Sequence, residues 1–426
     1  MDDLQRERIV GAVLAEIQRQ GILGPQQSWS GGNGNGAGRF STKLERIAII
    51  GAGNGGMAIA AHQTLKGYKV NLFSFYGREL KPIREKGGIE VFGGAEGFAR
   101  LNLVTESMEE AVKDAQVIMV VAPASSHIAI ATLLTPLVKD GQIIVLNPGR
   151  TGGSIEFARA MRRQGLRTRP YLAETNTLIY AAETRAPARV EILKEKNKMR
   201  VSAFPAKDNP VVIPMLQQMY PQIEAGQNVL EIAFNNVGGV FHPAAALLNT
   251  ATLQRVAGGE KGLHWYGNMI TQPVCDMVME KMDKEKVSLA EAFGLDAWPA
   301  LKWVWESYGV KGNTLFEALR SNPHVAGFSA PGDLYAFHNI LDEVPNNLVP
   351  QASFAKVVGI PTPAMDSIVN LACVMTGIDF WSMGRTVESL GLGGMSKEEI
   401  LYFVEQVGLQ PVRMDVQPER VLQGVS

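Results

Sequence analysis

Two short segments in the C-terminal half contain residue types that can move protons. His242 precedes Pro243 and follows the glycine pair 238–239, which places it near the start of a helix. A near-neutral imidazole can act as a general acid or base at working pH. Asp342 and Glu343 are adjacent carboxylates shortly before a proline, and a carboxylate can orient an imidazole and stabilise its protonated form. On the residues alone, a capping or core histidine and an exposed acidic turn are the open alternatives.

A glycine-rich segment near the N-terminus predicts a site for a dinucleotide. Residues 47–58 have the pattern of an apolar strand, a glycine loop and a helix of small residues. Gly51 permits a tight turn, Gly53 lets the backbone approach a pyrophosphate, and Gly56 lets helix and strand pack closely. The free N–H groups at the helix start then receive the phosphates. The candidate cofactor-binding residues of this loop are Gly51, Gly53, Asn54, Gly55, Gly56 and Met57.

The next strand indicates which dinucleotide is preferred. Residues 69–74 end without the Asp or Glu that would bind a ribose 2′-hydroxyl, and Ser74 occupies that place with Arg78 close behind. A guanidinium binds phosphate through a planar fork, so this pair favours NADP(H) and leaves NAD(H) possible. The alternative is that Arg78 is only a solvated loop cation.

Two further loops are expected to border the nicotinamide, because ligands of such sheets lie beyond the carboxyl ends of the strands. One loop contains Ala122 and Pro123, and the other contains Asn147 and Arg150. Arg150 could hold a substrate carboxylate or a phosphate, and a structural ion pair is an equal alternative.

The elements that must position these residues follow from hydrophobic patterning. Short, β-branched runs at 47–50, 69–73, 117–121 and 142–146 alternate with helical spacing. Such runs suit strands that are buried on both faces of a parallel sheet, so we predict a Rossmann-type, doubly wound α/β domain. Strand-like residues 190–194 and 199–204 flank a charged turn, which predicts an antiparallel hairpin that closes this domain.

The remaining chain divides around this domain. Residues 1–40 combine an amphipathic helix with a Gly/Asn-rich linker, an arm without recognisable chemistry. The α/β domain is expected over 41–208. From 209 to 426 helical spacing dominates, so the second domain should be mainly α-helical and should supply the substrate site.

Composition excludes several classes of protein. With 41 basic and 42 acidic residues the net charge is -1, which removes the usual drive towards nucleic acid or anionic membranes. Two distant cysteines allow neither a disulfide framework nor a Cys-based zinc site, and we expect no metal. No secretory signal or membrane-length apolar run is present, which indicates a cytoplasmic protein. The low charged fraction of 19% makes a homodimer plausible.

Taken together, these motifs resemble the octopine/nopaline (opine) dehydrogenase family from about residue 47 to 408. Besides the glycine loop, the resemblance is carried by four segments: Leu146–Gly153, Ala173–Leu178, His242–Pro243 and Asp342–Pro363. It implies a reductive condensation, in which the amino group of an amino acid joins a 2-oxo acid and NAD(P)H reduces the imine. It also implies a catalytic pair of His242 with Glu343, where the family more often has Asp.

One departure bears on the substrate. Where the family often carries an arginine that holds a substrate carboxylate, this chain has His338. His264 and Trp265 are candidate substitutes, together with Arg255 and Lys261. Two other functions stay open: a hydroxy-acid dehydrogenase without amine condensation, and a non-catalytic, cofactor-binding regulator that docks a partner through the N-terminal helix.

Overall fold

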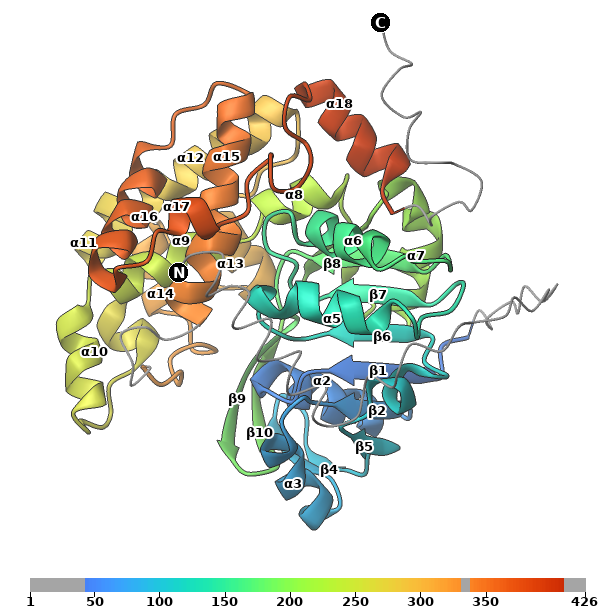
Figure 1. Cartoon of the computed structure of the whole chain (residues 1–426). Coiled ribbons are helices and arrows are strands. Elements are labelled where there is room, and N and C mark those ends of the chain that lie inside the picture. The colour runs from blue at the N-terminus through green and yellow to red at the C-terminus, as the bar shows by residue number, and fades with distance from the viewer. Residues whose placement is uncertain (1–42, 331–337, 410–426) are drawn as a thin grey trace, which may run out of the picture.

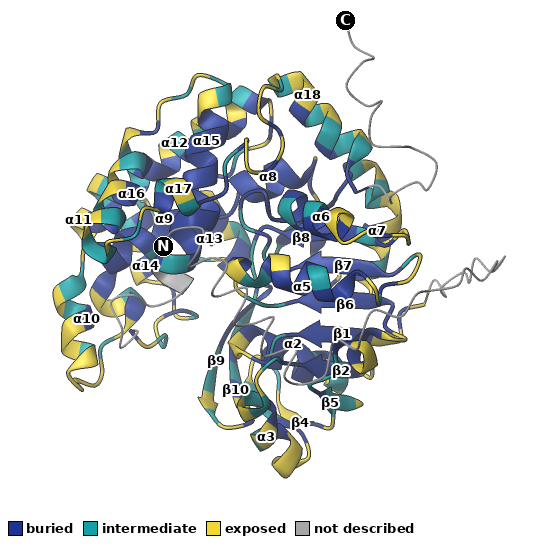
Figure 2. Ribbon diagram, viewed as in Figure 1, coloured by how far each residue is buried: buried dark blue, intermediate teal, exposed yellow. Residues whose placement is uncertain are grey.

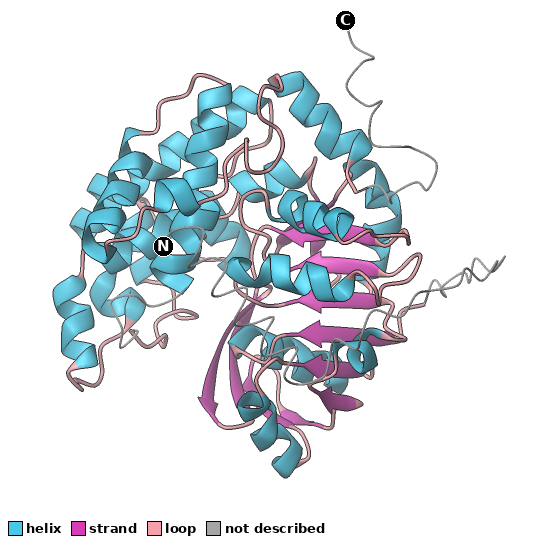
Figure 3. Ribbon diagram, in the orientation of Figure 1, coloured by secondary structure: helices cyan, strands magenta, loops and turns pink. Residues whose placement is uncertain are grey.

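The computed structural model describes residues 43–330 and 338–409, and only the backbone of residues 338 and 339. A sheet-containing domain lies beside a helical domain, with the boundary between strands and helices running through the middle of the molecule (Figures 1 and 3). The combination of an α/β domain and an α-helical domain predicted from the sequence is confirmed. The N-terminal arm expected over 1–40 lies outside the described residues.

The α/β domain is built on an eight-stranded sheet in the order β12-β11-β8-β7-β6-β1-β2-β5. All neighbours are parallel except β8 and β11. The strand order reverses where β2 and β6 flank β1, which puts the ligand crevice at the carboxyl ends of β1 and β6. The strands are β1 (Arg46–Ile50), β2 (Lys69–Phe73), β5 (Leu103–Thr105), β6 (Val117–Val120), β7 (Ile143–Leu146), β8 (Tyr171–Thr175), β11 (Met199–Ala203) and β12 (Ile223–Ala225).

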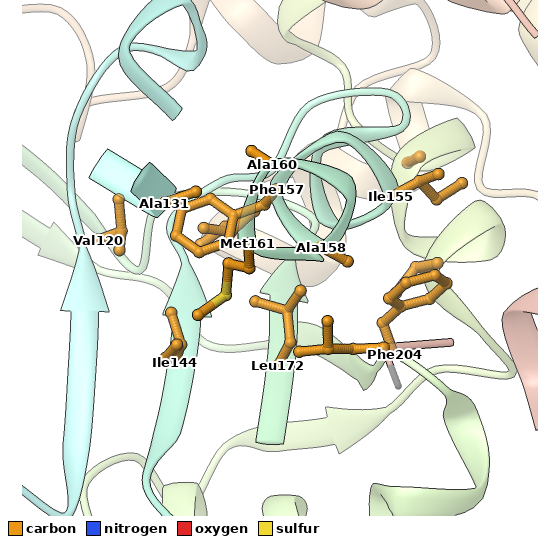
Figure 4. Packing of buried hydrophobic residues seen from close by; sticks show 14 of the residues in the cluster. Val120, Ala131, Ile144, Ile155, Phe157, Ala158, Ala160, Met161, Leu172 and Phe204 are labelled. Carbon is orange, nitrogen blue, oxygen red and sulfur yellow. The ribbon is translucent and has the colours of Figure 1, made fainter. Parts of the chain in front are cut away.

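Helices cover this sheet as the doubly wound pattern requires. The packing of one face is shown in Figure 4, where Phe157 and Met161 of the covering helix lie over Ile144 and Leu172 of two adjacent strands. The central strands β1, β6, β7 and β8 are buried almost throughout, which explains their unbroken apolar runs (Figure 2). The helices of this domain are α2 (Asn54–Leu65), α3 (Gly77–Lys86), α4 (Met108–Val112), α5 (His127–Leu134), α6 (Gly153–Arg163) and α7 (Asn209–Gln217).

A second, four-stranded sheet corrects the predicted hairpin. It has the order β4-β3-β10-β9, formed by β3 (Ile89–Gly93), β4 (Gly97–Ala99), β9 (Tyr180–Ala186) and β10 (Arg189–Glu195). β10 pairs with β9 and β3, whereas β11 pairs with β8 in the large sheet. The hairpin of 190–194 with 199–204 is therefore wrong. The charged turn carries the chain from one sheet to the other, and a local turn signal does not say which strands are partners.

The helical domain begins later than expected. α7 packs on β11 and β12, so the sheet domain continues past the predicted boundary at 208 as far as Ala225. The helices that follow are α8 (Val229–Phe234), α9 (Gly238–Leu247), α10 (Thr250–Ala257), α11 (Gln272–Val274), α12 (Glu280–Phe293), α13 (Ala300–Tyr308), α14 (Leu315–Arg320), α15 (Val349–Val357), α16 (Pro363–Thr376), α17 (Phe380–Met383) and α18 (Lys397–Tyr402). Wider π-helical turns occur at η3 (Trp265–Met269), η4 (Cys275–Met279), η5 (His338–Asp342), η6 (Val344–Leu348) and η7 (Phe403–Val407). Within the described ranges, no helix combines the length and apolarity needed to cross a bilayer.

Candidate functional site

The glycine loop has the geometry that a bound pyrophosphate requires. Gly51 follows β1 with a φ of +118°, and a side chain there or at Gly56 would collide with backbone carbonyl oxygens. Nothing lies within 4 Å of the position that a Cβ of Gly53 would take, so the backbone is open on that side. α2 starts without a side-chain cap and without an acidic residue in its first turn, which leaves its first N–H groups for an anion. The residues therefore fit a dinucleotide.

The other predicted residues of the glycine loop contact the rest of the protein. Met57 is buried, and the side-chain oxygen of Asn54 accepts a hydrogen bond from the backbone N–H of Thr184 at 3.0 Å. A Cβ on Gly55 would lie 2.7 Å from a methyl carbon of Leu178. Met57 and Asn54 hold the loop against the core and against β9, and Gly55 leaves room for the side chain of Leu178.

The carboxyl end of β2 carries both signs of charge. Ser74 is buried and its hydroxyl donates a 2.6 Å hydrogen bond to the carboxylate of Glu79, which is in the first turn of α3. Arg78 is exposed and lies over the ring of Tyr76, 5.2 Å from its centroid. The strand itself ends without an acidic residue, as the sequence shows, but a carboxylate reaches Ser74 from outside the strand. The helix after the strand supplies the carboxylate five residues beyond Ser74.

The two predicted loops lie at the ends of β6 and β7. Ala122 is half-buried and Pro123 exposed, while Asn147 is buried and its amide donates to the Val145 carbonyl at 3.1 Å. The backbone N–H of Ser125 donates to Oδ1 of Asp342 at 3.2 Å. The first loop thus contacts the helical domain through the acidic segment.

His242 and Glu343 lie in contact. Nδ1 of His242 is 2.6 Å from Oε1 of Glu343, and the amide of Asn347 donates to Oε2 at 3.1 Å. Glu343 is fully buried, whereas 29% of the His242 side chain is exposed. The carboxylate therefore fixes the Nδ1 edge of the imidazole and leaves the opposite ring nitrogen, Nε2, for a ligand.

The helix that carries His242 begins earlier than the sequence suggested. α9 starts at Gly238, so His242 is its fifth residue and not near its start. The glycine pair forms the first two residues of the helix and does not precede it. A Cβ at Gly238 would lie 2.5 Å from Oε1 of Glu343 and 2.7 Å from Nη1 of Arg150, and a Cβ at Gly239 would lie 2.9 Å from the Asn347 amide. The glycines let the helix backbone approach the buried polar groups.

Arg150 is part of this cluster through an ion pair. Its Nη1 is 2.8 Å from Oε1 of Glu343, and its Nε is 3.4 Å from Oδ2 of Asp342. Burial acts to raise the pKa of Glu343, but the Arg150 guanidinium and the His242 hydrogen bond hold that pKa below its ordinary value. Burial raises the pKa of Asp342, against the opposing effect of Arg150. Asp342 forms an ion pair with Arg150 and accepts a hydrogen bond from Ser125. It lies beside the His242–Glu343 pair (the dyad) and does not contact His242 in the described structure.

The predicted substrate residues fall into three different places. Trp265 is buried beside His242, with the ring centroids 6.0 Å apart and edge to face. His264 is exposed, and its backbone forms a bridge to Ser329. The backbone of His338 begins η5, and its side chain lies outside what the structure describes.

Some residues of the site were missed from the sequence. Asn347 bonds Glu343, the side chain of Asn236 at 3.0 Å and the hydroxyl of Thr151 at 2.9 Å. Its spacing of four residues from Glu343 is the only local signal, since neighbours at that spacing share a helix face. Across the described ranges, no group of three or more His, Cys, Asp or Glu side chains could hold a metal ion.

Models of two known protein families match the two domains of the chain. Residues 46–150 match the N-terminal model of NAD-dependent glycerol-3-phosphate dehydrogenase, and residues 225–376 match the α-helical domain of NAD/NADP octopine/nopaline dehydrogenase. An opine dehydrogenase from Arthrobacter sp. (strain 1C) is 34% identical over 359 residues, covering 84% of this chain and 98% of the relative.

Solved structures share the fold. An octopine dehydrogenase with NADH and L-arginine has a TM-score of 0.63 at 18% identity, covering 84% of this chain and 98% of the other. A yersinopine dehydrogenase with NADP+ bound has a TM-score of 0.59 at 15% identity, covering 86% and 99%. The chain therefore belongs to the opine dehydrogenase family of NAD(P)-dependent dehydrogenases that act on CH–NH donors.

Proposed function

We propose that this enzyme condenses the amino group of an amino acid with a 2-oxo acid and reduces the resulting imine, with His242 as general acid and base. The observation that supports this most directly is the 2.6 Å contact between Nδ1 of His242 and the buried carboxylate of Glu343. An amine, an oxo acid, NAD(P)H and a proton give a secondary amine, water and NAD(P)+. Proton delivery is the part that the protein must supply.

The dyad suits this proton transfer. A carboxylate at Nδ1 stabilises the protonated imidazole and sets the direction of the opposite nitrogen, which can donate to the oxygen that leaves as water. Trp265 covers one side of the imidazole and limits water there. NAD(P)H, when bound along the glycine loop, supplies the hydride.

Arg150 and Asp342 are proposed as positioning residues. The guanidinium compensates two carboxylates that are almost fully buried, so the Glu343 carboxylate can stay ionised beside His242. Without that cation, burial would favour the protonated carboxyl and weaken its hold on a charged imidazole.

For the cofactor, we propose that NADP(H) is favoured and that NAD(H) is also used. Arg78 is exposed at the end of β2, where a 2′-phosphate would meet its guanidinium. Glu79 lies close to Arg78 and can accept a hydrogen bond from a 2′-hydroxyl. The expected preference for NADP(H) over NAD(H) is therefore small. The ratio of kcat/KM for the two cofactors measures this preference.

A screen of amines against 2-oxo acids, followed by NADPH absorbance, tests the reaction. Oxidation of NADPH that requires both substrates, with a secondary amine as product, is expected. Turnover of an oxo acid that no amine accelerates would favour a hydroxy-acid dehydrogenase. Cofactor binding without turnover across the screen would favour the non-catalytic regulator. The expected cytoplasmic location and homodimer remain predictions, to be tested by cell fractionation and by mass measurement in solution.

The variant His242→Asn tests the acid–base role. It keeps a side chain of similar polarity at the dyad but cannot hold the proton. We expect kcat to fall by about 10²–10⁴-fold while the dissociation constant for NADPH changes little, because the glycine loop is untouched. Unchanged turnover would remove the role assigned to His242.

A further inference from the structure

Lys196 is a buried cation that the proposed chemistry does not yet use. It follows β10 and only 5% of it is exposed. Its ammonium donates to the hydroxyl of Thr177 at 2.6 Å and to the carbonyl of Leu178 at 2.7 Å. An ammonium has three N–H groups, so one more acceptor can be bound. Within the described ranges, no carboxylate forms an ion pair with it, although buried charges in proteins are normally paired.

A buried hydrogen-bond donor without an acceptor lies beside Lys196, on the side chain of Trp303. Its ammonium is 5.0 Å from the ring centroid of Trp303 and 5.7 Å from that of Tyr308. Nε1 of Trp303 is buried and has no hydrogen-bond partner in the described part of the chain. An unpaired buried donor is costly, and two neighbouring donors call for an acceptor that brings several oxygen atoms.

Lys196 binds a short segment of the chain, residues 176–178, that contacts both the glycine loop and the polar groups around Glu343. The side chain of Leu178, whose carbonyl Lys196 binds, adjoins the glycine loop at Gly55. The carbonyl of Asn176, in the same short segment, accepts a 2.9 Å hydrogen bond from Asn236. Asn236 in turn bonds the amide of Asn347, which holds Glu343. The segment 176–178 therefore connects the cofactor loop with the dyad, and Lys196 is anchored on it.

The other cations that the sequence offered for a substrate carboxylate are paired or exposed. Arg150 is paired with both acidic residues of the cluster. Arg255 is exposed and paired with Glu260, and Lys261 is exposed. Burial, followed by the nearby Arg150 charge, lowers the pKa of Lys196 to about 7, so an arriving anion would restore the charged form that burial disfavours.

We propose that Lys196 binds the carboxylate of the 2-oxo acid. It would take the role of the arginine that the family often carries at the position of His338. The carboxylate would accept a hydrogen bond from the third N–H of the ammonium and would lie against Trp303. This assignment rests on the proposed function, since it presumes an oxo acid as substrate. It predicts that the chain distinguishes a charged oxo acid from an uncharged analogue largely through one side chain.

The test compares a 2-oxo acid with its primary amide as substrates of Lys196→Met and of the wild type. The variant keeps most of the aliphatic volume and removes the ammonium. We expect the KM for the acid to rise roughly 10- to 100-fold and the KM for the amide to change little. Lys198→Met is the matched control, because that ammonium pairs with Glu224 and Glu306 at 3.0 Å each, and its KM values should stay at the wild-type level.

The outcomes separate the two proposals. Wild-type turnover together with an unchanged KM for the acid in Lys196→Met overturns the assignment of Lys196 alone. An equal rise of KM for acid and amide assigns Lys196 to packing and overturns it as well. Absence of wild-type turnover with every amine and oxo acid overturns the proposed function and this inference with it. If Lys196→Met does not fold, Lys196→Gln, which keeps N–H donors without the charge, gives the same comparison.

Discussion

Replacing Arg150 by methionine tests how the acidic cluster is stabilised. The change removes the only cation that forms ion pairs with both Asp342 and Glu343 in the described structure, while both carboxylates stay buried. At separations of 2.8 and 3.4 Å each attraction is worth several kcal/mol before the cost of desolvation is subtracted, at an effective dielectric constant of about 20. Breaking a buried ion pair by removing one partner typically costs about 3–5 kcal/mol. We expect the free energy of unfolding at neutral pH to fall by about that amount.

The effect should depend on pH in a defined direction. Without Arg150 the folded-state pKa values of both carboxyls rise above their unfolded values, so the folded variant binds more protons than the unfolded chain. Its stability should therefore fall as pH rises from about 4 through those raised pKa values, and its deficit against the wild type should be larger at about pH 8 than at about pH 5. Urea denaturation of the cofactor-free protein, followed by tryptophan fluorescence, measures this.

Two further variants complete the experiment. Adding Asp342→Asn to Arg150→Met removes one of the two uncompensated charges and should restore about 1–2 kcal/mol. Arg100→Met is the matched control, since Arg100 is exposed over Phe98, and it should stay within about 0.5 kcal/mol of the wild type. If Arg150→Met unfolds within about 1 kcal/mol of the wild type at both pH values, Arg150 does not compensate the buried acids and the reasoning fails.

Two shorter predictions concern catalysis and cofactor choice. Gly238→Ala should displace Glu343 or Arg150 and lower kcat by about 10–100-fold at unchanged NADPH affinity, as single-turnover kinetics can show. Gly258→Ala, whose Cβ would lie 3.4 Å from its nearest neighbours, should not change kcat, and equal losses in both would contradict the packing argument. Glu79→Gln should raise the preference for NADPH over NADH by about tenfold in kcat/KM, because a negative charge leaves the ribose site. An unchanged ratio would show that Glu79 does not face the ribose.

The comparison of sequence with structure shows where local patterns suffice. The spacing of Gly51, Gly53 and Gly56 defines a loop within one strand–helix unit, and the structure has that unit. His242 and Glu343 are far apart in the chain, and the family resemblance, not their local surroundings, paired them. The role of Gly238 could not be predicted, because the atoms that exclude a Cβ come from Glu343 and Arg150.

Long-range pairing explains the other misses. Nothing in residues 189–203 says that β10 joins a second sheet while β11 crosses to the first. β10 pairs with β9, which directly precedes it, and with the distant β3, whereas β11 pairs with β8. Glu79 was overlooked because an acidic residue was sought at the strand end itself, whereas the first turn of α3 brings it back to Ser74. The burial of Lys196 depends on Trp303 and Tyr308, which belong to the other domain.

The segment around Asp342 and Glu343 in the helical domain contacts two loops of the cofactor-binding domain. Asp342 accepts from the N–H of Ser125 in the loop after β6, and the carbonyl of Asn346 accepts from the N–H of Thr151 in the loop after β7 at 3.0 Å. Both loops lie at the carboxyl ends of strands, where the nicotinamide is expected. The π-helical turn η5 ends just before Glu343, and η6 begins just after it. Such wide turns are frequent at functional sites. We therefore expect a shift of these loops on cofactor binding to move Asp342 and Asn346, and with them Glu343 between them, so that the two domains would act as one site.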